Sequence, residues 1–127
     1  MNSNKTDHPV KTLVILLNMG GPQNKDEIHP YLKELFQDRE LLKLPFQKIL
    51  GRFIAWRRTP KIQERYEEIG QYSPTKAIME SQCEGIAQKL DQLNPESAPH
   101  VCVSGFRYCS PRPGEMIKKY KEAEKII

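Results

Sequence analysis

Residues 12–22 read TLVILLNMGGP, and the fold prediction starts from this stretch. After Thr12 the run is continuously apolar up to Leu17, which is typical of a strand covered on both faces in a parallel sheet. The loop Asn18–Pro22 follows at the carboxyl end of that strand, where such folds bind ligands. Two adjacent glycines also simply permit a tight turn, which is their more common use. The full G-x-G-x-x-G pattern is absent, so dinucleotide binding has little support.

The rest of the chain alternates helical patterns with one more strand. The predicted elements are a short helix after a turn at Pro30, a helix over 46–57, a helix from Thr59-Pro60 to Gly70, a long helix from Ser73-Pro74 to Asn94-Pro95, a strand over 100–106 and a helix over about 115–127. A strand, a long helical excursion, a strand and a helix predict the α/β class with a parallel sheet.

Composition narrows the function classes. At 127 residues the chain is at most one small domain or a piece of a larger one. We predict a disordered leader over 1–10, which has no apolar core of a secretory signal and no arginine typical of a mitochondrial presequence. Three cysteines without a C-x-x-C pair argue against disulfides or a zinc site and favour a reducing intracellular compartment. Basic and acidic residues alternate, so nucleic acid is not an expected partner.

An apolar stripe and a pair of arginines are candidates for binding. Phe46, Phe53 and Trp56 recur at helical spacing, and core packing is the common explanation of such a stripe; a membrane surface is the alternative. Arg57-Arg58 suits a flat apolar ligand with carboxylate arms, because guanidinium groups bind carboxylates bidentately. A solvated basic turn is the ordinary interpretation of such a pair.

Other polar residues give weaker signals. His29 and His100 are isolated and are expected at the surface or as caps. Arg107-Tyr108 lies at the carboxyl end of the second predicted strand and would face the same crevice as Gly20-Gly21. Cys109 beside it is expected to be an inert thiol rather than an iron ligand.

Three segments, in matching order and spacing, resemble ferrochelatases. They are residues 16–22 (LLNMGGP), residues 57–64 (RRTPKIQE) with Tyr66, Ile69-Gly70 and Ser73-Pro74, and residues 105–108 (GFRY). The resemblance runs from about Lys11 to the last residue. It implies the chelatase fold, two Rossmann-like halves around a porphyrin cleft, of which residues 11–127 would form an incomplete first half-domain.

The resemblance also implies roles for individual residues. Arg58, Tyr66 and Ser73 match porphyrin-contacting positions, and Met19 matches a residue over the macrocycle. Arg57, Arg107 and Tyr108 match positions that line the cleft. The family's apolar, membrane-touching lip corresponds to Leu32, Leu35, Phe36, Leu41 and Ile54.

The chain departs from the family pattern at three places. Tyr72 stands in the family's glycine run before Ser-Pro, Ser110 stands where a histidine is usual, and Pro113 replaces a threonine cap. These changes suggest relaxed demands on the cleft.

The family's proton-accepting histidine, its acidic partners and its iron–sulfur cysteines lie beyond the matched region. We therefore predict no catalytic residue, no metal ligand and no resident cofactor here, and no insertion of ferrous iron into protoporphyrin IX by this chain alone. It would be a pseudoenzyme or a fragment of the lyase of haem biosynthesis, with protoporphyrin or haem as its ligand. The alternative is an interaction module for a membrane surface, a full-length ferrochelatase or another protein. The resemblance implies a mitochondrial location, and the cytoplasm is expected if no presequence is used.

Overall fold

The computed structural model describes residues 9–127. They form two compact units: the sheet unit, built from the residues up to Asn18 together with Ala77–Ile127, and the helix unit, Met19–Lys76. Most of the predicted leader, residues 1–8, lies outside the described residues, and Val10 at its end is buried.

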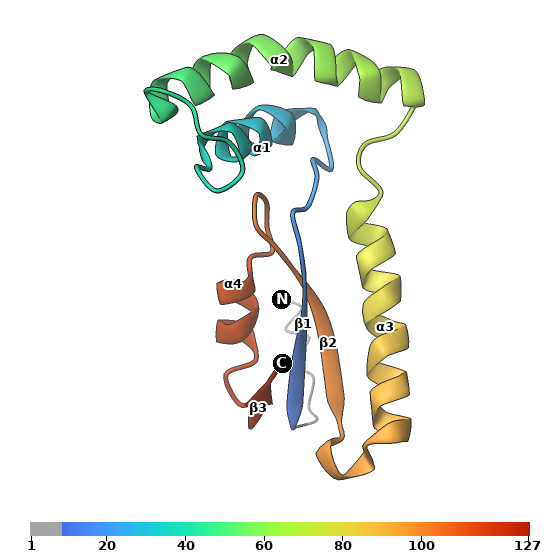
Figure 1. Ribbon diagram of the computed structural model, residues 1–127. Coiled ribbons are helices and arrows are strands. Elements are labelled where there is room, and N and C mark those ends of the chain that lie inside the picture. Colours follow the sequence, from blue (N-terminus) through green and yellow to red (C-terminus); the bar gives the residue numbers. More distant parts are fainter. Residues whose placement is uncertain (1–8) are drawn as a thin grey trace, which may run out of the picture. The chain divides into compact units, whose positions relative to one another are not determined.

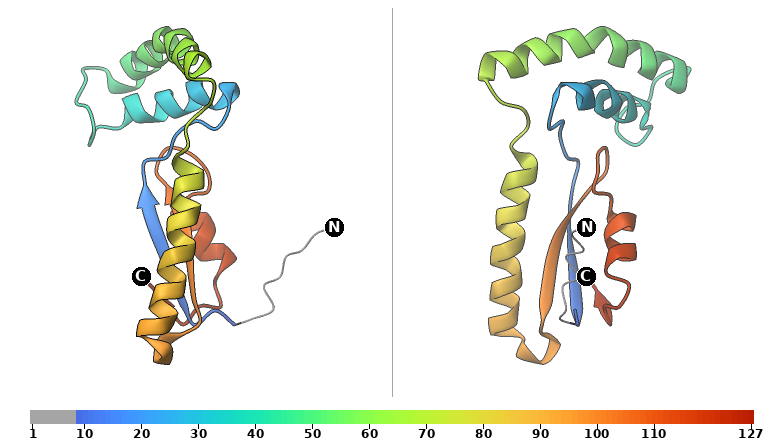
Figure 2. Two further views of the ribbon diagram at one scale, coloured as in Figure 1. Left: turned by 90° about the vertical axis from the view of Figure 1, so that its right-hand side faces the viewer. Right: turned by 180° about the vertical axis from the view of Figure 1, so that it is seen from behind.

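The sheet unit contains a three-stranded parallel sheet with the order β2-β1-β3 (Figure 1). β1 (Thr12–Asn18) pairs along its whole length with β2 (His100–Phe106), so both predicted strands are confirmed. α3 (Thr75–Leu93) and α4 (Pro113–Lys119) flank the sheet on opposite sides (Figures 1 and 2). The fold class is α/β, as predicted, and matches a partial Rossmann-like chelatase fold.

The last predicted helix is wrong beyond Lys119. The chain leaves the helical conformation at Tyr120, and β3 (Lys125–Ile126) pairs with the start of β1. The amide of Ile127 donates to the carbonyl of Leu13, and the amide of Ile15 donates to that of Ile127, both at 2.8 Å. Ile126 and Ile127 are β-branched and favour an extended backbone. The helical spacing of the apolar residues before them hid this preference in the sequence.

The helix unit consists of α1 (Lys25–Gln37) packed against α2 (Gln47–Ile69). α1 begins before Pro30, because the Asn24 side chain caps the amide of Glu27 at 3.1 Å and the Glu27 carboxylate accepts from the amide of Gln23. The predicted turn at Pro30 is therefore wrong. Because Pro30 has no backbone N–H, one carbonyl of the preceding helical turn lacks its usual hydrogen bond.

α2 is one continuous helix, so the predicted helix start at Thr59-Pro60 is also wrong. The Thr59 hydroxyl donates backward to the carbonyl of Ala55 at 2.7 Å, as threonines inside helices do, instead of capping a new helix. Residues on both sides of Pro60 pack against one core cluster, Ile28, Leu32, Phe36 and Ala55. This shared packing keeps the two halves of the helix in line.

The inward face of α2 is made of small and polar residues rather than the predicted aromatic stripe. Gln47, Gly51 and Ala55 are buried, whereas Phe46 and Trp56 are 85% and 66% exposed. A Cβ at Gly51 would lie 2.8 Å from the carbonyl oxygen of Phe36, and the Gln47 amide donates to that same oxygen at 2.8 Å. Close backbone approach thus selects the inward face, and the core interpretation of the stripe is wrong.

α3 packs on β2 through buried side chains of the sheet unit. Met79 and Cys83 are buried on α3, whereas Ile78 and Leu93 are exposed. Burial, with a contribution from contact with Cys83, raises the pKa of Cys102 on β2 to about 12. Among residues 9–127, no helix is both long enough and apolar enough to cross a membrane.

His100 is buried, contrary to the expected surface position. Its Nδ1 lies 2.7 Å from Oδ1 of Asp91, and its backbone amide donates to the same oxygen at 2.8 Å. Its Nε2 lies 3.0 Å from the Ser97 hydroxyl. The side chain therefore joins the end of α3, the 3₁₀ turn Pro95–Ser97 and the start of β2.

The hydrogen bonds from His100 hold the pKa of Asp91 below its ordinary value. A lowered native pKa gives stability that is present above the unfolded pKa, about 3.9, and is lost as the pH falls. We therefore expect the wild-type melting temperature to drop more steeply between pH 6 and pH 3 than that of Asp91→Asn, which melts lower at pH 6. Glu84→Gln, an exposed change on the same helix, should melt like the wild type. Parallel pH profiles for wild type and Asp91→Asn would contradict this role.

Candidate functional site

The loop Met19–Pro22 is held in a tight turn inside the helix unit. Gly20 has a φ of +86°, a conformation that favours glycine, and its carbonyl accepts a bond from the Tyr31 hydroxyl at 3.1 Å. Gly21 and Pro22 are buried, while the Met19 side chain is 42% exposed. The turn interpretation of the glycine pair is confirmed, and Met19 is the residue of this loop that faces solvent.

Ser73 lies against this loop. Its amide donates to the carbonyl of Pro22 at 3.0 Å, and the Gln23 side chain donates both to Gly21 (3.2 Å) and to the Ser73 carbonyl (3.1 Å). A Cβ at Gly21 would lie 2.6 Å from that of Ser73. Two predicted site residues far apart in sequence, Met19 and Ser73, are thus brought to adjoining segments. Nothing in the sequence marks Gln23 as the bridge.

Tyr66 lies on the last turns of α2 and packs at the edge of the core cluster. Its ring centroid is 5.5 Å from that of Tyr72, which also packs against the cluster. A tyrosine phenol is neutral at physiological pH, and burial raises the pKa of the Tyr66 phenol further above its ordinary value. Tyr72 immediately precedes Ser73 in the chain.

Arg57 and Arg58 lie in the middle of α2 and not at a junction between helices, which corrects the predicted position. Both side chains are exposed, and the Arg58 guanidinium lies 5.6 Å from the ring of Phe36. Arg58 precedes Tyr66 by about 12 Å of helix rise, and both border the core cluster. The helix unit therefore carries an exposed cation and a phenol beside its core cluster, and a hydroxyl on the segment that follows α2.

Arg107 and Tyr108 belong to the sheet unit. The Arg107 amide donates to the carbonyl of Asn18 at 3.0 Å, which ties the ends of β2 and β1 together. Tyr108 is buried, with its ring 5.7 Å from the exposed Arg107 guanidinium. Arg107 is thus accessible to a ligand, and Tyr108 presents little surface to one.

The predicted apolar lip is only partly at the surface. Leu32 and Phe36 are buried in the core cluster, because α1 uses them to pack against α2, and this part of the assignment is wrong. Leu35 and Ile54 are half-buried, and Leu41 is 44% exposed. Four strongly exposed apolar residues gather instead at the start and along the first half of α2: Phe46, Ile49, Phe53 and Trp56, which we call the α2 stripe.

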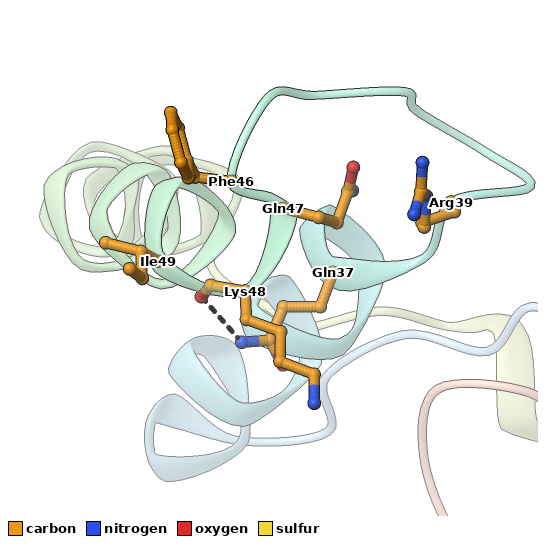
Figure 3. Close-up of a pocket in the computed structure, with 6 residues that line it drawn as sticks. All are labelled: Gln37, Arg39, Phe46, Gln47, Lys48 and Ile49. Carbon is orange, nitrogen blue, oxygen red and sulfur yellow. Dashed lines mark hydrogen bonds between the residues drawn. The ribbon is translucent and has the colours of Figure 1, made fainter.

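Two hollows open beside the α2 stripe. One of ≈ 330 Å³ lies between the end of α1 and the start of α2, where the Gln37 amide donates to the carbonyl of Lys48 at 3.0 Å (Figure 3). Phe46 and Lys48 extend in opposite directions around it (Figure 3). The other, of ≈ 440 Å³, is lined by Pro45, Phe46, Ile49, Leu50 and Phe53. None of the seven predicted site residues lines either hollow.

Comparison with known proteins decides the family. The Ferrochelatase family model matches residues 11–127. The chain belongs to the ferrochelatase family. It is 52% identical over 101 residues to the mitochondrial ferrochelatase of Xenopus laevis and 49% identical over 109 residues to that of Homo sapiens. The corresponding protein of Schizosaccharomyces pombe is 44% identical over 113 residues.

These alignments cover most of this chain but a small part of each relative. They take in 80%, 86% and 88% of the chain and 25%, 26% and 27% of the three ferrochelatases. The chain thus spans about a quarter of the length of the curated relatives it matches. The family resemblance inferred from three short segments is confirmed over the whole matched region.

The contact between Gly21 and Ser73 gives a direct test of how the site is built. Gly21→Ala should destabilise the helix unit by about 1–3 kcal/mol, because the new Cβ forces the Ser73 segment away. Gly85→Ala, where a Cβ meets open space on a helix, should be neutral or stabilise by up to about 1 kcal/mol. Urea denaturation followed by circular dichroism measures both. Equal stability of Gly21→Ala and wild type would mean that the two segments do not need to touch.

Proposed function

We propose that this chain binds porphyrin as a member of the haem-biosynthetic ferrochelatase family. The observation that carries the proposal is the helix unit, in which hydrogen bonds hold the Met19 loop against Ser73 while Tyr66 and Arg58 border the same core cluster. Protoporphyrin combines a flat apolar ring with two carboxylate arms. The helix unit offers complementary groups: an arginine and a phenol on α2, and a thioether and a hydroxyl on the adjoining segments.

Each residue has a role that follows from its chemistry. The exposed guanidinium of Arg58 pairs with a propionate carboxylate, with Arg57 as a second cation nearby. The neutral Tyr66 phenol and the Ser73 hydroxyl contact the macrocycle, and the flexible Met19 thioether packs on its face. Within the sheet unit, the exposed Arg107 guanidinium is a separate candidate for a carboxylate, and its contact with the buried Tyr108 ring supports it. This binding needs no resident cofactor.

We further propose that the 127-residue chain by itself holds porphyrin without inserting iron, as a pseudoenzyme would. Metal insertion requires a base that accepts two pyrrole protons from a bound ring. Of the two histidines that the structure describes, His100 is buried and bonded to Asp91 and Ser97, and His29 lies on α1. His100 is therefore not available to a ligand as a free base. The names of the relatives favour mitochondria as the location.

A titration of the purified chain with protoporphyrin and with haem tests the binding, read by the Soret band and by Trp56 fluorescence. We expect saturable binding that Arg58→Ala weakens about ten- to hundredfold, through loss of a charge-assisted bond, and Tyr66→Ala about tenfold. Arg65→Ala, an exposed arginine on the same helix, is the control and should bind like the wild type. Binding that is absent, or indifferent to Arg58 and Tyr66, would refute the proposal. Metalloporphyrin formed above the spontaneous rate would refute its non-catalytic part.

A second function, attachment to an anionic membrane surface, is favoured by the α2 stripe. Phe53 and Trp56 are 51% and 66% exposed with rings 6.0 Å apart, and Phe46 is held in a left-handed conformation while 85% exposed. A bulky residue in the left-handed conformation is strained, and such strained residues cluster at functional sites. From Gln47 to Gln63 the helix carries five basic residues and no acidic one. An apolar stripe with basic flanks suits the interface of an anionic bilayer.

Co-sedimentation with lipid vesicles tests this second function. The wild type should partition onto vesicles containing phosphatidylserine more strongly than onto phosphatidylcholine vesicles, and less so as salt is raised. The double variant Phe53→Ser/Trp56→Ser should lower the partition coefficient about tenfold or more through lost apolar burial. Ile78→Ser, at an apolar residue 53% exposed on α3, is the matched control. Equal partition of the double variant and this control would exclude the stripe as the membrane contact.

A further inference from the structure

Tyr72 links two residues of the proposed porphyrin site. Its ring centroid lies 5.5 Å from that of Tyr66 with the planes tilted by 30°, within the range of favourable aromatic pairs. Its side chain also packs against the core cluster of α1 and α2. The next residue is Ser73, whose amide is bonded to Pro22.

The backbone explains why Tyr72 returns to α2 after the helix has ended. Gly70 has a φ of +76°, and its amide donates to the carbonyls of Tyr66 and Glu67 at 3.0 and 3.1 Å. This left-handed cap reverses the chain, so that a residue six positions after Tyr66 packs beside it. Tyr72 is therefore fixed from two sides, by the helix cap before it and by the Ser73–Pro22 bond after it.

We propose that Tyr72 is a positioning residue of the porphyrin site: its ring holds that of Tyr66 in place and thereby fixes the spacing between Tyr66 and Ser73. The inference rests on the proposed porphyrin-binding function. Tyr66 carries a neutral phenol on a side chain that is only half-buried, so its ring would otherwise be free to rotate away from a ligand. Pairing with an anchored ring lowers the entropy that Tyr66 loses when porphyrin binds.

The test compares protoporphyrin dissociation constants of three variants with the wild type. Tyr72→Leu keeps apolar volume in the core but removes the ring pair, and it should weaken binding about three- to tenfold. Tyr72→Phe restores a ring and should bind within about twofold of the wild type. The control is Gln71→Leu, which introduces the same residue at the exposed neighbouring position and should leave the affinity unchanged.

A second readout separates positioning from a general loss of structure. In protein labelled with ¹³C at tyrosine Cζ, the raised pKa of Tyr66 should move toward the ordinary tyrosine value in Tyr72→Leu and stay raised in Tyr72→Phe. If the wild type binds, Tyr66→Ala fails and Tyr72→Leu binds normally, the positioning role is overturned while the proposed function stands. If the wild type itself does not bind protoporphyrin, both are overturned.

Discussion

The arrangement of the helix unit depends on how closely α2 approaches the carbonyl of Phe36. Gly51 has no Cβ to hold the backbones apart, and the Gln47 amide satisfies the buried oxygen at the crossing. With these residues inward, the bulky members of the α2 stripe must point to solvent. The same rotation of the helix about its axis sets Arg58 and Tyr66 along the border of the core cluster. One steric constraint therefore determines both candidate surfaces of this unit.

Sequence patterns predicted the elements whose signal is local and strong. The apolar run of β1, the second strand and the long third helix lie where periodicity and turn residues placed them. Thr59-Pro60 misled because a cap and a back-bonded threonine look alike in sequence, and only packing on both sides of Pro60 distinguishes them. β3 was missed because the helical spacing of the apolar residues concealed the β-branched pair at the end, whose strand is completed by pairing with β1.

The candidate site was predictable in its residues but not in its assembly. Family resemblance named Met19, Arg58, Tyr66 and Ser73, yet no spacing rule indicates that Ser73 would bond to the loop after β1. Exposure was harder still. Hydrophobicity patterns assign an aromatic stripe to the core and polar or small residues to the surface. On α2 the aromatic stripe is exposed, and the buried face consists of Gln, Gly and Ala. The free energy gained by close backbone packing does not appear in such patterns.

The pairing of β1 has a consequence for how the chain folds. Both neighbours of β1 come from the far end of the sequence, since Thr12 aligns with His100 on one side and with Lys125 on the other. Helices α1 and α2 are close in sequence and can associate early, whereas the sheet can form only after residues 100–126 have been synthesised. Until then the segment TLVILL is an unpaired, β-prone apolar strand. Protection of this segment by a chaperone during synthesis would then limit aggregation and control the yield of folded protein.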